Sequence, residues 1–480
     1  MSTEAIQVDN DEKFNRLGFQ DISKLLLEFS VPALIGLITQ ALYNIIDAIY
    51  VGHGVGEYGL AATTVVFPGM IVIAAIAVLI GYGGNSLAAI KLGEHKKSEA
   101  EKILANTIVL SVLFYLVAAV LVLAFLDPLL TFSGATSEVL PYAREFLSII
   151  ILFGIFDIFA FGLSNFIRTS GYPNTALATM VVGVGVNVIL GYLFVIVFAW
   201  GMKGAAFATG CSWVVSTLYV FAFFLSKRSP LKLRRENFKL DVSTSLNILK
   251  LGVPMAFLQI GMALIVVVQN YLITTYGALD AEVGASGGLA AMSVLGRIGY
   301  LSIVPAVGIA QGAQPIFGFN YGARNYGRIL ETLKKAILAA FIIMFVFWLV
   351  IMVYPEVFVR LFGLEGRHID YTAQSLRLYL LVVPIIAYQI IGANYFQSSG
   401  QALKATLLTL TRQIFFLIPL LFVAPLILPK FVPISALQSI YLAESISDFF
   451  SVALVAAFLV PEMRKLKRLA EQAQEEGVQA

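Results

Sequence analysis

Charged side chains are scarce in this sequence: they make up 13% of its 480 residues. Soluble domains usually carry about 25%. The composition therefore excludes a soluble enzyme and a nucleic-acid-binding protein. A single cysteine, Cys211, allows no internal disulfide. Residues 1–24 are polar and rich in acids, without the apolar stretch of a secretory leader, so we expect no cleavable signal peptide.

Hydrophobic residues are abundant and make up 59% of the chain. A transmembrane helix needs about 20 mostly apolar residues, whereas the strands of a membrane barrel are about 10 residues long and alternate. The long runs here predict an all-α, polytopic membrane protein. Twelve spans are expected, at about 25–51, 60–82, 103–126, 142–164, 175–198, 204–225, 247–276, 289–312, 334–354, 370–396, 402–425 and 434–460.

The basic residues indicate an orientation. Of the 32 Lys and Arg residues, 23 fall at the two ends of the chain or in loops after even-numbered spans, and only 4 in loops after odd-numbered spans. Positively charged loops stay in the cytoplasm, so both termini are predicted to be cytoplasmic. The basic segment 226–241 is interpreted as a linker between two halves, with a patch for anionic lipid as the alternative.

The two halves repeat each other. Gly59-Leu60-Ala61-Ala62 returns as Gly288-Leu289-Ala290-Ala291, and the segment 165–171 returns as 394–400, both at an offset of 229 residues. Val31-Pro32 pairs with Val253-Pro254 at an offset of 222. Six spans per half keep both halves in the same orientation, which predicts two parallel-repeat six-helix bundles and suits alternating access in a secondary transporter.

The sequence lacks the motifs for nucleotide hydrolysis and for enzymatic catalysis. The chain contains no Gly-Lys pair and therefore no phosphate-binding P-loop. The sequence offers no catalytic residues, no metal-ligand motif and no cofactor motif, and we do not expect an enzyme. Coupling to an ion gradient is the remaining source of energy.

An ionised side chain inside the bilayer costs at least about 2.5–3.5 kcal/mol, so the acids within the spans are functional candidates. Gln40, Tyr43, Asn44 and Asp47 form one polar stripe on span one. A carboxylate shielded from water there can bind and release a proton, or can ligate sodium with nearby oxygens. The alternative is a structural carboxylate at a helix end.

Further charges lie on other spans. Glu444 and Asp448 follow helical spacing on span twelve, and Arg412 on span eleven is a candidate counter-ion. This group is interpreted either as a buried ion pair or as a cation- or substrate-binding site. Asp157 on span four is a third candidate, and an ion-pair role is favoured for Arg297. With 36 Phe and 20 Tyr, the chain could also line a cleft for lipophilic organic cations. The favoured alternative is that most of these rings face lipid or pack helices.

Over about residues 25–460 the sequence resembles the multidrug and toxic compound extrusion (MATE) family, most of all its bacterial exporters of cationic drugs. Each motif is weak alone, and the resemblance depends on their order and spacing. The matching stretches are Tyr43-Asn44-Ile45-Ile46-Asp47, Gly59-Leu60-Ala61-Ala62, Ser170-Gly171-Tyr172-Pro173-Asn174, Gly204-Ala205-Ala206-Phe207-Ala208-Thr209, Gln311-Gly312-Ala313-Gln314-Pro315, Asn320-Tyr321-Gly322-Ala323 and Asn394-Tyr395-Phe396-Gln397-Ser398.

The resemblance implies twelve helices in two lobes and antiport of organic cations against inward protons or sodium. It places the coupling ion at Asp47, Asn187 and Thr209. The acid that the family usually carries four residues after the span-five Asn is replaced by Gly191. Asp47 is then the only acid at this site, which favours protons over a sodium ion bound at Asp47.

These interpretations give five segments: an N-terminal segment 1–24, an N lobe 25–225, a linker 226–246, a C lobe 247–460 and a C-terminal tail 461–480. We expect a monomer in the bacterial cytoplasmic membrane, with organic cations and membrane lipids as its partners. Two alternatives remain. One is a flippase of a lipid-linked precursor with the same fold, using Arg168, Arg297 and Arg412. The other is an intramembrane enzyme or scaffold.

Overall fold

A computed structural model describes residues 16–133, 135–280, 283–361 and 367–475. Within these ranges twelve helical segments are long and apolar enough to cross a membrane, which confirms the predicted count. The elements are α2 (Ile22–Gly54), α3 (Glu57–Val65), α4 (Phe67–Gly93), α5 (Lys97–Ala124), α6 (Leu126–Phe132), α7 (Leu140–Thr169), α8 (Pro173–Gly191), η1 (Tyr192–Val197), α9 (Gly201–Leu225), η2 (Arg235–Phe238), α10 (Val242–Gly277), α11 (Gly284–Gly322), α12 (Tyr326–Val353), α13 (Pro355–Arg360), α14 (Arg367–Tyr379), η3 (Val383–Ile385), α15 (Ile386–Ser398), α16 (Ala402–Leu410), η4 (Thr411–Leu417), α17 (Ile418–Ile427), η5 (Leu428–Lys430) and α18 (Ala436–Glu475).

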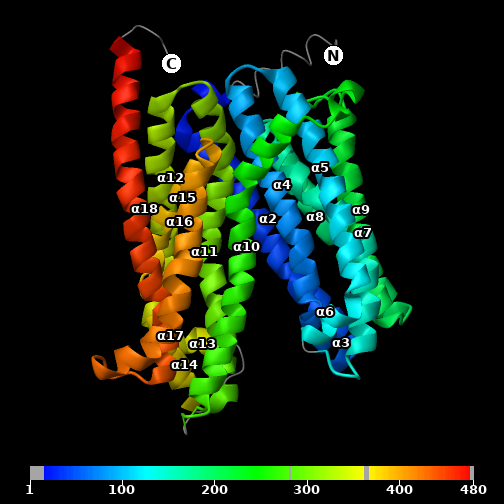
Figure 1. Cartoon of the computed structure of the whole chain (residues 1–480), viewed down its shortest axis with the longest axis vertical. Coiled ribbons are helices and arrows are strands. Elements are labelled where there is room, and N and C mark those ends of the chain that lie inside the picture. Colours follow the sequence, from blue (N-terminus) through cyan, green and yellow to red (C-terminus); the bar gives the residue numbers. More distant parts are fainter. Residues whose placement is uncertain (1–15, 134, 281–282, 362–366, 476–480) are drawn as a thin grey trace.

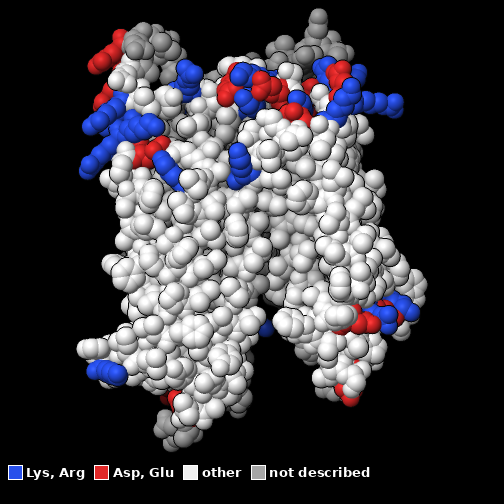
Figure 2. Space-filling model, in the orientation of Figure 1, with Lys and Arg blue, Asp and Glu red and all other residues white. Residues whose placement is uncertain are grey.

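The helices form two lobes (Figure 1), an N lobe of α2–α9 and a C lobe of α10–α18. The N-terminal end of α2 and the C-terminal end of α18 lie at the same end of the molecule, called here the terminal end. The lobes meet there and separate toward the other end, called the open end. Figure 2 shows a notch between the lobes at the open end, a band of basic and acidic residues at the terminal end and few charges between them.

Close backbone contacts join the lobes near the terminal end. A Cβ atom added to Gly93 of α4 would meet the carbonyl oxygen of Phe319 on α11, and one added to Gly322 would meet that of Ile90. Ile90 corresponds to Phe319, and Gly93 to Gly322, at the 229-residue offset of the repeat. The two halves therefore exchange equivalent contacts, as a parallel repeat requires.

Helix α11 continues ten residues beyond the end of the predicted span at 312. The extra turns carry amides that a lipid-facing helix would avoid. Here they lie between the lobes and find partners: Gln314 Nε2 donates to Ser86 Oγ at 3.1 Å, and Asn320 Nδ2 donates to the Leu17 carbonyl at 3.0 Å. Hydropathy underestimates the length of α11 because these residues are buried in protein rather than in lipid.

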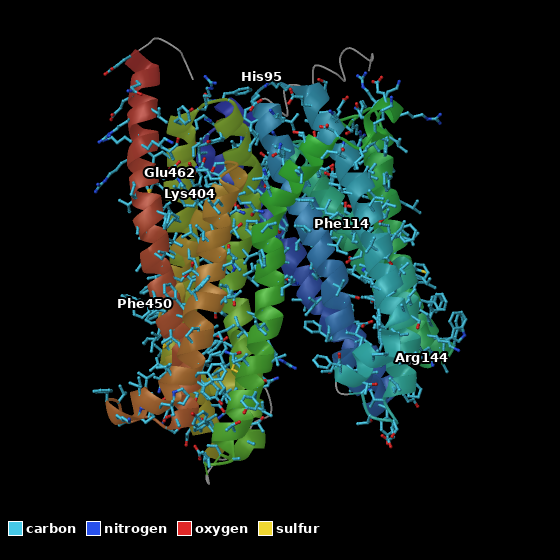
Figure 3. All side chains as sticks on the ribbon, viewed as in Figure 1. His95, Phe114, Arg144, Lys404, Phe450 and Glu462 are labelled. Atoms are coloured by element: carbon cyan, nitrogen blue, oxygen red, sulfur yellow. The ribbon has the colours of Figure 1, made fainter. Side chains whose placement is uncertain are left out.

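Other boundaries also differ from the prediction. The second predicted span begins at 60, but residues 57–65 form the separate helix α3, and α4 continues to Gly93. Helix α10 begins at Val242, within the predicted linker. Helix α18 continues to Glu475, so most of the predicted tail is helical. In this continuation Glu462 pairs with Lys404 at 3.3 Å (Figure 3).

Candidate functional site

The polar stripe predicted on span one lies on α2, a continuous helix that begins at the cap Asp21 and includes Pro32. Tyr43 and Asp47 are half-buried on it and Gln40 is exposed. The side chain of Asn44, also predicted for this stripe, lies outside the described part of the structure. Among the described residues no hydrogen bond or ion pair reaches the Asp47 carboxylate, which leaves it free to take up a proton.

Three of the predicted residues meet beside Asp47. Asn187 on α8 donates from Nδ2 to Thr209 Oγ1 on α9 at 3.2 Å, and the hydroxyl oxygens of Thr209 and Tyr43 are 3.5 Å apart. Asn187 and Thr209 are buried. Asp47 and Asp157 both interact electrostatically with the Tyr43 hydroxyl. The side chains of Asn187, Thr209 and Tyr43 thus form a row of hydrogen bonds between helices α8, α9 and α2. The charges of Asp47 and Asp157 act on the Tyr43 end of this row.

Gly191, which stands where the resembled family usually carries a second acid, is closely packed by Tyr50. A Cβ atom on Gly191 would lie 2.8 Å from Tyr50 Cδ2, so the Tyr50 ring fills the space that a second carboxylate would need. The Oδ1 atom of Asn187 is buried and has no hydrogen-bond partner among the described residues. No group of three or more His, Cys, Asp or Glu side chains that could hold a metal occurs among those residues either.

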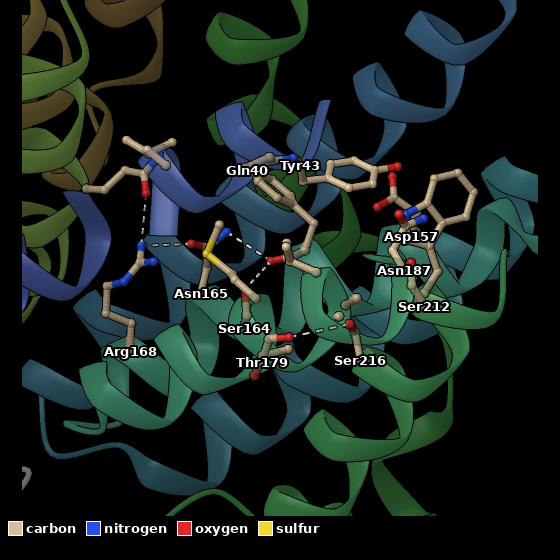
Figure 4. Close-up of a pocket in the computed structure, with 18 residues that line it drawn as sticks. Gln40, Tyr43, Asp157, Ser164, Asn165, Arg168, Thr179, Asn187, Ser212 and Ser216 are labelled. Carbon is tan, nitrogen blue, oxygen red and sulfur yellow. Dashed lines mark hydrogen bonds between the residues drawn. The ribbon is translucent and has the colours of Figure 1, made fainter. Parts of the chain in front are cut away.

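A pocket opens beside this chain of hydrogen bonds, within the N lobe (Figure 4). Its cavity volume is about 110 Å³. Tyr43, Asn187 and Asp157 line one end. Asp157, which the sequence places on span four without a partner, therefore lies in the same pocket as the predicted residues of α2 and α8. Aromatic and apolar side chains, including Phe161 and Trp213, complete this part of the lining.

Arg168 lies at the other end of the pocket (Figure 4). Its Nη1 atom donates to Asn165 Oδ1 at 3.1 Å and to Gln311 Oε1 of the C lobe at 3.4 Å. The side chain is buried, and its Nε atom has no hydrogen-bond partner among the described residues. Arg168 and Asp157 are eleven residues apart on one face of α7, about 16 Å along the helix axis. The pocket is therefore acidic at one end and basic at the other.

The lining residues that were not predicted from the sequence include Ser212, Trp213 and Ser216, all on α9. They follow Thr209 at helical spacing on α9, so the stripe of small polar residues at 209, 212 and 216 was a usable signal. Ser216 Oγ donates to the Thr179 carbonyl of α8 at 3.4 Å, which ties the two helices together below the pocket.

The candidates in the C lobe form a second polar cluster. Arg412 Nε donates to Asp448 Oδ1 at 2.6 Å, so the predicted counter-ion is present. Glu444 instead accepts from Gln269 Nε2 of α10 at 2.7 Å. The ion pair predicted for Arg297 is not found: its side chain is exposed, and no described carboxylate lies within 4 Å of it.

We propose that the Arg412–Asp448 pair holds α18 against the π-helical segment η4. Asp448→Asn is expected to cost about 3–5 kcal/mol of stability, because the largely shielded Arg412 then loses the carboxylate that it bonds. Thermal unfolding in detergent measures this loss. Glu356→Gln, which breaks the exposed pair with Arg377, should cost less than about 1 kcal/mol. Equal losses in the two variants would contradict the assignment.

Comparisons with known proteins identify the family of the chain. The model of the MatE family matches residues 32–193 and again 254–423, one match in each half of the chain. The multidrug export protein MepA of Staphylococcus haemolyticus is 24% identical over 445 residues, which cover 93% of this chain and 96% of MepA. MepA of Staphylococcus aureus strain N315 is 22% identical over 413 residues, 86% of this chain and 89% of the relative.

Solved structures of MATE family transporters resemble this structure. An outward-facing multidrug resistance MATE family transporter of the MOP superfamily superposes with a TM-score of 0.85, at 25% identity, covering 94% of this chain and 98% of the other. A MOP superfamily transporter from Pyrococcus furiosus, described as having a binding pocket of reverse polarity, matches with the same scores and coverage. A MATE crystal structure in the bent conformation reaches 0.86 at 24% identity, covering 95% and 99%.

Proposed function

Because the chain belongs to the MatE family, we propose that it is a secondary active antiporter that exports amphiphilic organic cations in exchange for protons. The observation that carries this proposal is the pocket in the N lobe. It combines an acid, Asp157, with aromatic and apolar walls, and it adjoins a second acid, Asp47.

The pocket suits an organic cation on two grounds. Asp157 supplies a negative charge in a site largely shielded from water, where charge attraction is strong. The ring faces of Tyr43, Phe161 and Trp213 favour a flat cation by stacking and cation–π contact. The multidrug export named for the MepA relatives is consistent with such cargo.

Asp47 is the proposed coupling residue. Its charge acts on Tyr43, and Tyr43 continues through Thr209 to Asn187 at the wall of the pocket. Protonation of Asp47 removes one of the two negative charges that favour a cation, so proton binding weakens the hold on the drug. Protons are preferred over sodium because Tyr50 occupies the position of a second acidic ligand.

The transport cycle alternates between two openings. We propose that the terminal end faces the cytoplasm, since most Lys and Arg residues gather there (Figure 2). The notch at the open end then makes this the outward-open state, in which protons enter and drug leaves. Separation of the lobes at the terminal end would expose the pocket to the cytoplasm. We further propose that the protein works as a monomer in a bacterial cytoplasmic membrane.

Gradient-driven ethidium transport in proteoliposomes tests this function. An imposed pH gradient should drive ethidium movement, whereas a sodium gradient at equal pH should drive none. With one proton exchanged per ethidium, a gradient of one pH unit sustains an ethidium ratio of up to about tenfold. Transport driven by sodium alone would contradict proton coupling, and no transport under either gradient would contradict the antiporter itself.

A second candidate cargo is an anionic lipid-linked precursor, favoured by one observation: Arg168 is buried in the pocket with a free Nε atom. Competition in detergent separates the two. Displacement of bound ethidium by tetraphenylphosphonium but not by an isoprenyl diphosphate supports the cationic cargo, and the reverse supports the flippase.

A further inference from the structure

An apolar groove runs along the outer face of the C lobe, away from the pocket described above. Helix α12 forms one wall with Leu338 and Phe341, and helix α18 forms the other with Val452, Ala456 and Met463. Its volume is about 480 Å³. That lies within the roughly 300–1,000 Å³ typical of small-molecule sites. The groove is therefore large enough for a ligand but offers it almost no polar partner.

The length of the groove matches one leaflet of a bilayer. Val452 and Met463 mark its two ends on α18 and are eleven residues apart. At 1.5 Å per residue this separation is about 16 Å. Half of a hydrocarbon core of about 30 Å is about 15 Å. A single acyl chain that begins at the headgroup level of the terminal end would follow the groove to the middle of the membrane.

A lysine stands at the headgroup end. Lys334 lines the groove one turn before Leu338 on α12. The neighbouring acids are engaged elsewhere: Glu331 pairs with Lys335 at 2.6 Å, and Glu462 pairs with Lys404 at 3.3 Å. No described carboxylate lies within 4 Å of Lys334, so its charge is available to an anionic group from the bilayer.

We propose that this groove binds one anionic phospholipid, with an acyl chain between α12 and α18 and the phosphate at Lys334. The apolar walls select a hydrocarbon chain, and the lysine selects a negatively charged headgroup. This lipid site is separate from the transport pocket and does not depend on the proposed cargo or coupling ion.

Native mass spectrometry of the protein from bilayers of equal parts phosphatidylglycerol and phosphatidylcholine tests the site. One phosphatidylglycerol should stay bound in preference to phosphatidylcholine. A lysine near the membrane surface contributes roughly a fivefold preference for an anionic lipid, and Lys334→Gln should remove it. Lys250→Gln, an exposed lysine at the terminal end of α10, is the matched control and should leave the preference unchanged.

A second variant tests the chain-binding part of the groove. Ala456→Trp fills it and should abolish retention of both lipids, with an unchanged thermal unfolding transition in detergent serving as the check that the protein is folded. Equal retention of the two lipids by the unmodified protein would overturn the proposal. An equal loss in the Lys334 and Lys250 variants would also overturn it, because the effect would then be general surface charge.

Discussion

Replacing Asp47 with asparagine is expected to abolish drug accumulation driven by a pH gradient. The unmodified protein should sustain up to about a tenfold ethidium ratio per pH unit, and Asp47→Asn should leave a ratio of one. The amide keeps the size of the side chain but cannot bind and release a proton. The substitution breaks no hydrogen bond or ion pair among the described residues.

Two controls distinguish a loss of proton coupling from a general loss of folding or substrate binding. Asp370→Asn changes an exposed acid on α14 and should leave transport unchanged. Ethidium binding to Asp47→Asn, followed by fluorescence anisotropy in detergent, should be weaker but still detectable, because one negative charge is lost while Asp157 and the pocket are intact. Gradient-driven accumulation by Asp47→Asn at the unmodified level would show that the coupling proton binds elsewhere.

The second large effect, a change in the balance between outward-open and inward-open states, is expected at the close backbone contacts between the lobes. Gly93→Ala and Gly322→Ala each place a methyl group against a backbone carbonyl of the other lobe. Overpacking of this kind costs about 1–3 kcal/mol per site. The double variant should therefore shift the balance between outward-open and inward-open states by at least about 30-fold toward inward-open, and transport should fall accordingly.

Spin-label distances across the notch measure this shift. With Cys211→Ser as background, labels at Glu138 and Phe431 report the separation of the lobes at the open end. The double variant should show the shorter distance of a closed notch. Gly296→Ala, on the same helix as Gly322 but with open space around its Cβ position, is the matched control. An unchanged distance in the double variant would mean that the contacts of Gly93 and Gly322 do not determine which of the two states the protein adopts.

The sequence predicted the architecture because membrane helices obey strong local rules. Twelve apolar runs, a basic bias and a repeat at a fixed offset identify the spans and the two lobes without any knowledge of contacts. The predicted span boundaries are wrong where a helix is surrounded by protein rather than by lipid, as in the last turns of α11. They also failed where a polar helix leaves the bilayer, as in α18.

The site was predicted only in part. Asp47 was predicted from the polar stripe on span one, and Asn187 and Thr209 were predicted because the family motif names them. The structure brings Asn187 and Thr209 together beside Tyr43. Tyr50 was not found, because its role depends on the distance between two helices, which periodicity does not contain. The same holds for the place of Asp157 in the pocket and for the bond between Arg168 and Gln311.

The most direct test of the central claim is the movement of protons driven by substrate. Vesicles containing the protein and the pH dye pyranine are prepared without any pH gradient, and ethidium is added outside. Entry of ethidium should expel protons and raise the internal pH with the unmodified protein, and Asp47→Asn should give no change. An equal rise of internal pH with Asp47→Asn, or ethidium entry without proton movement in the unmodified protein, would contradict coupling through Asp47.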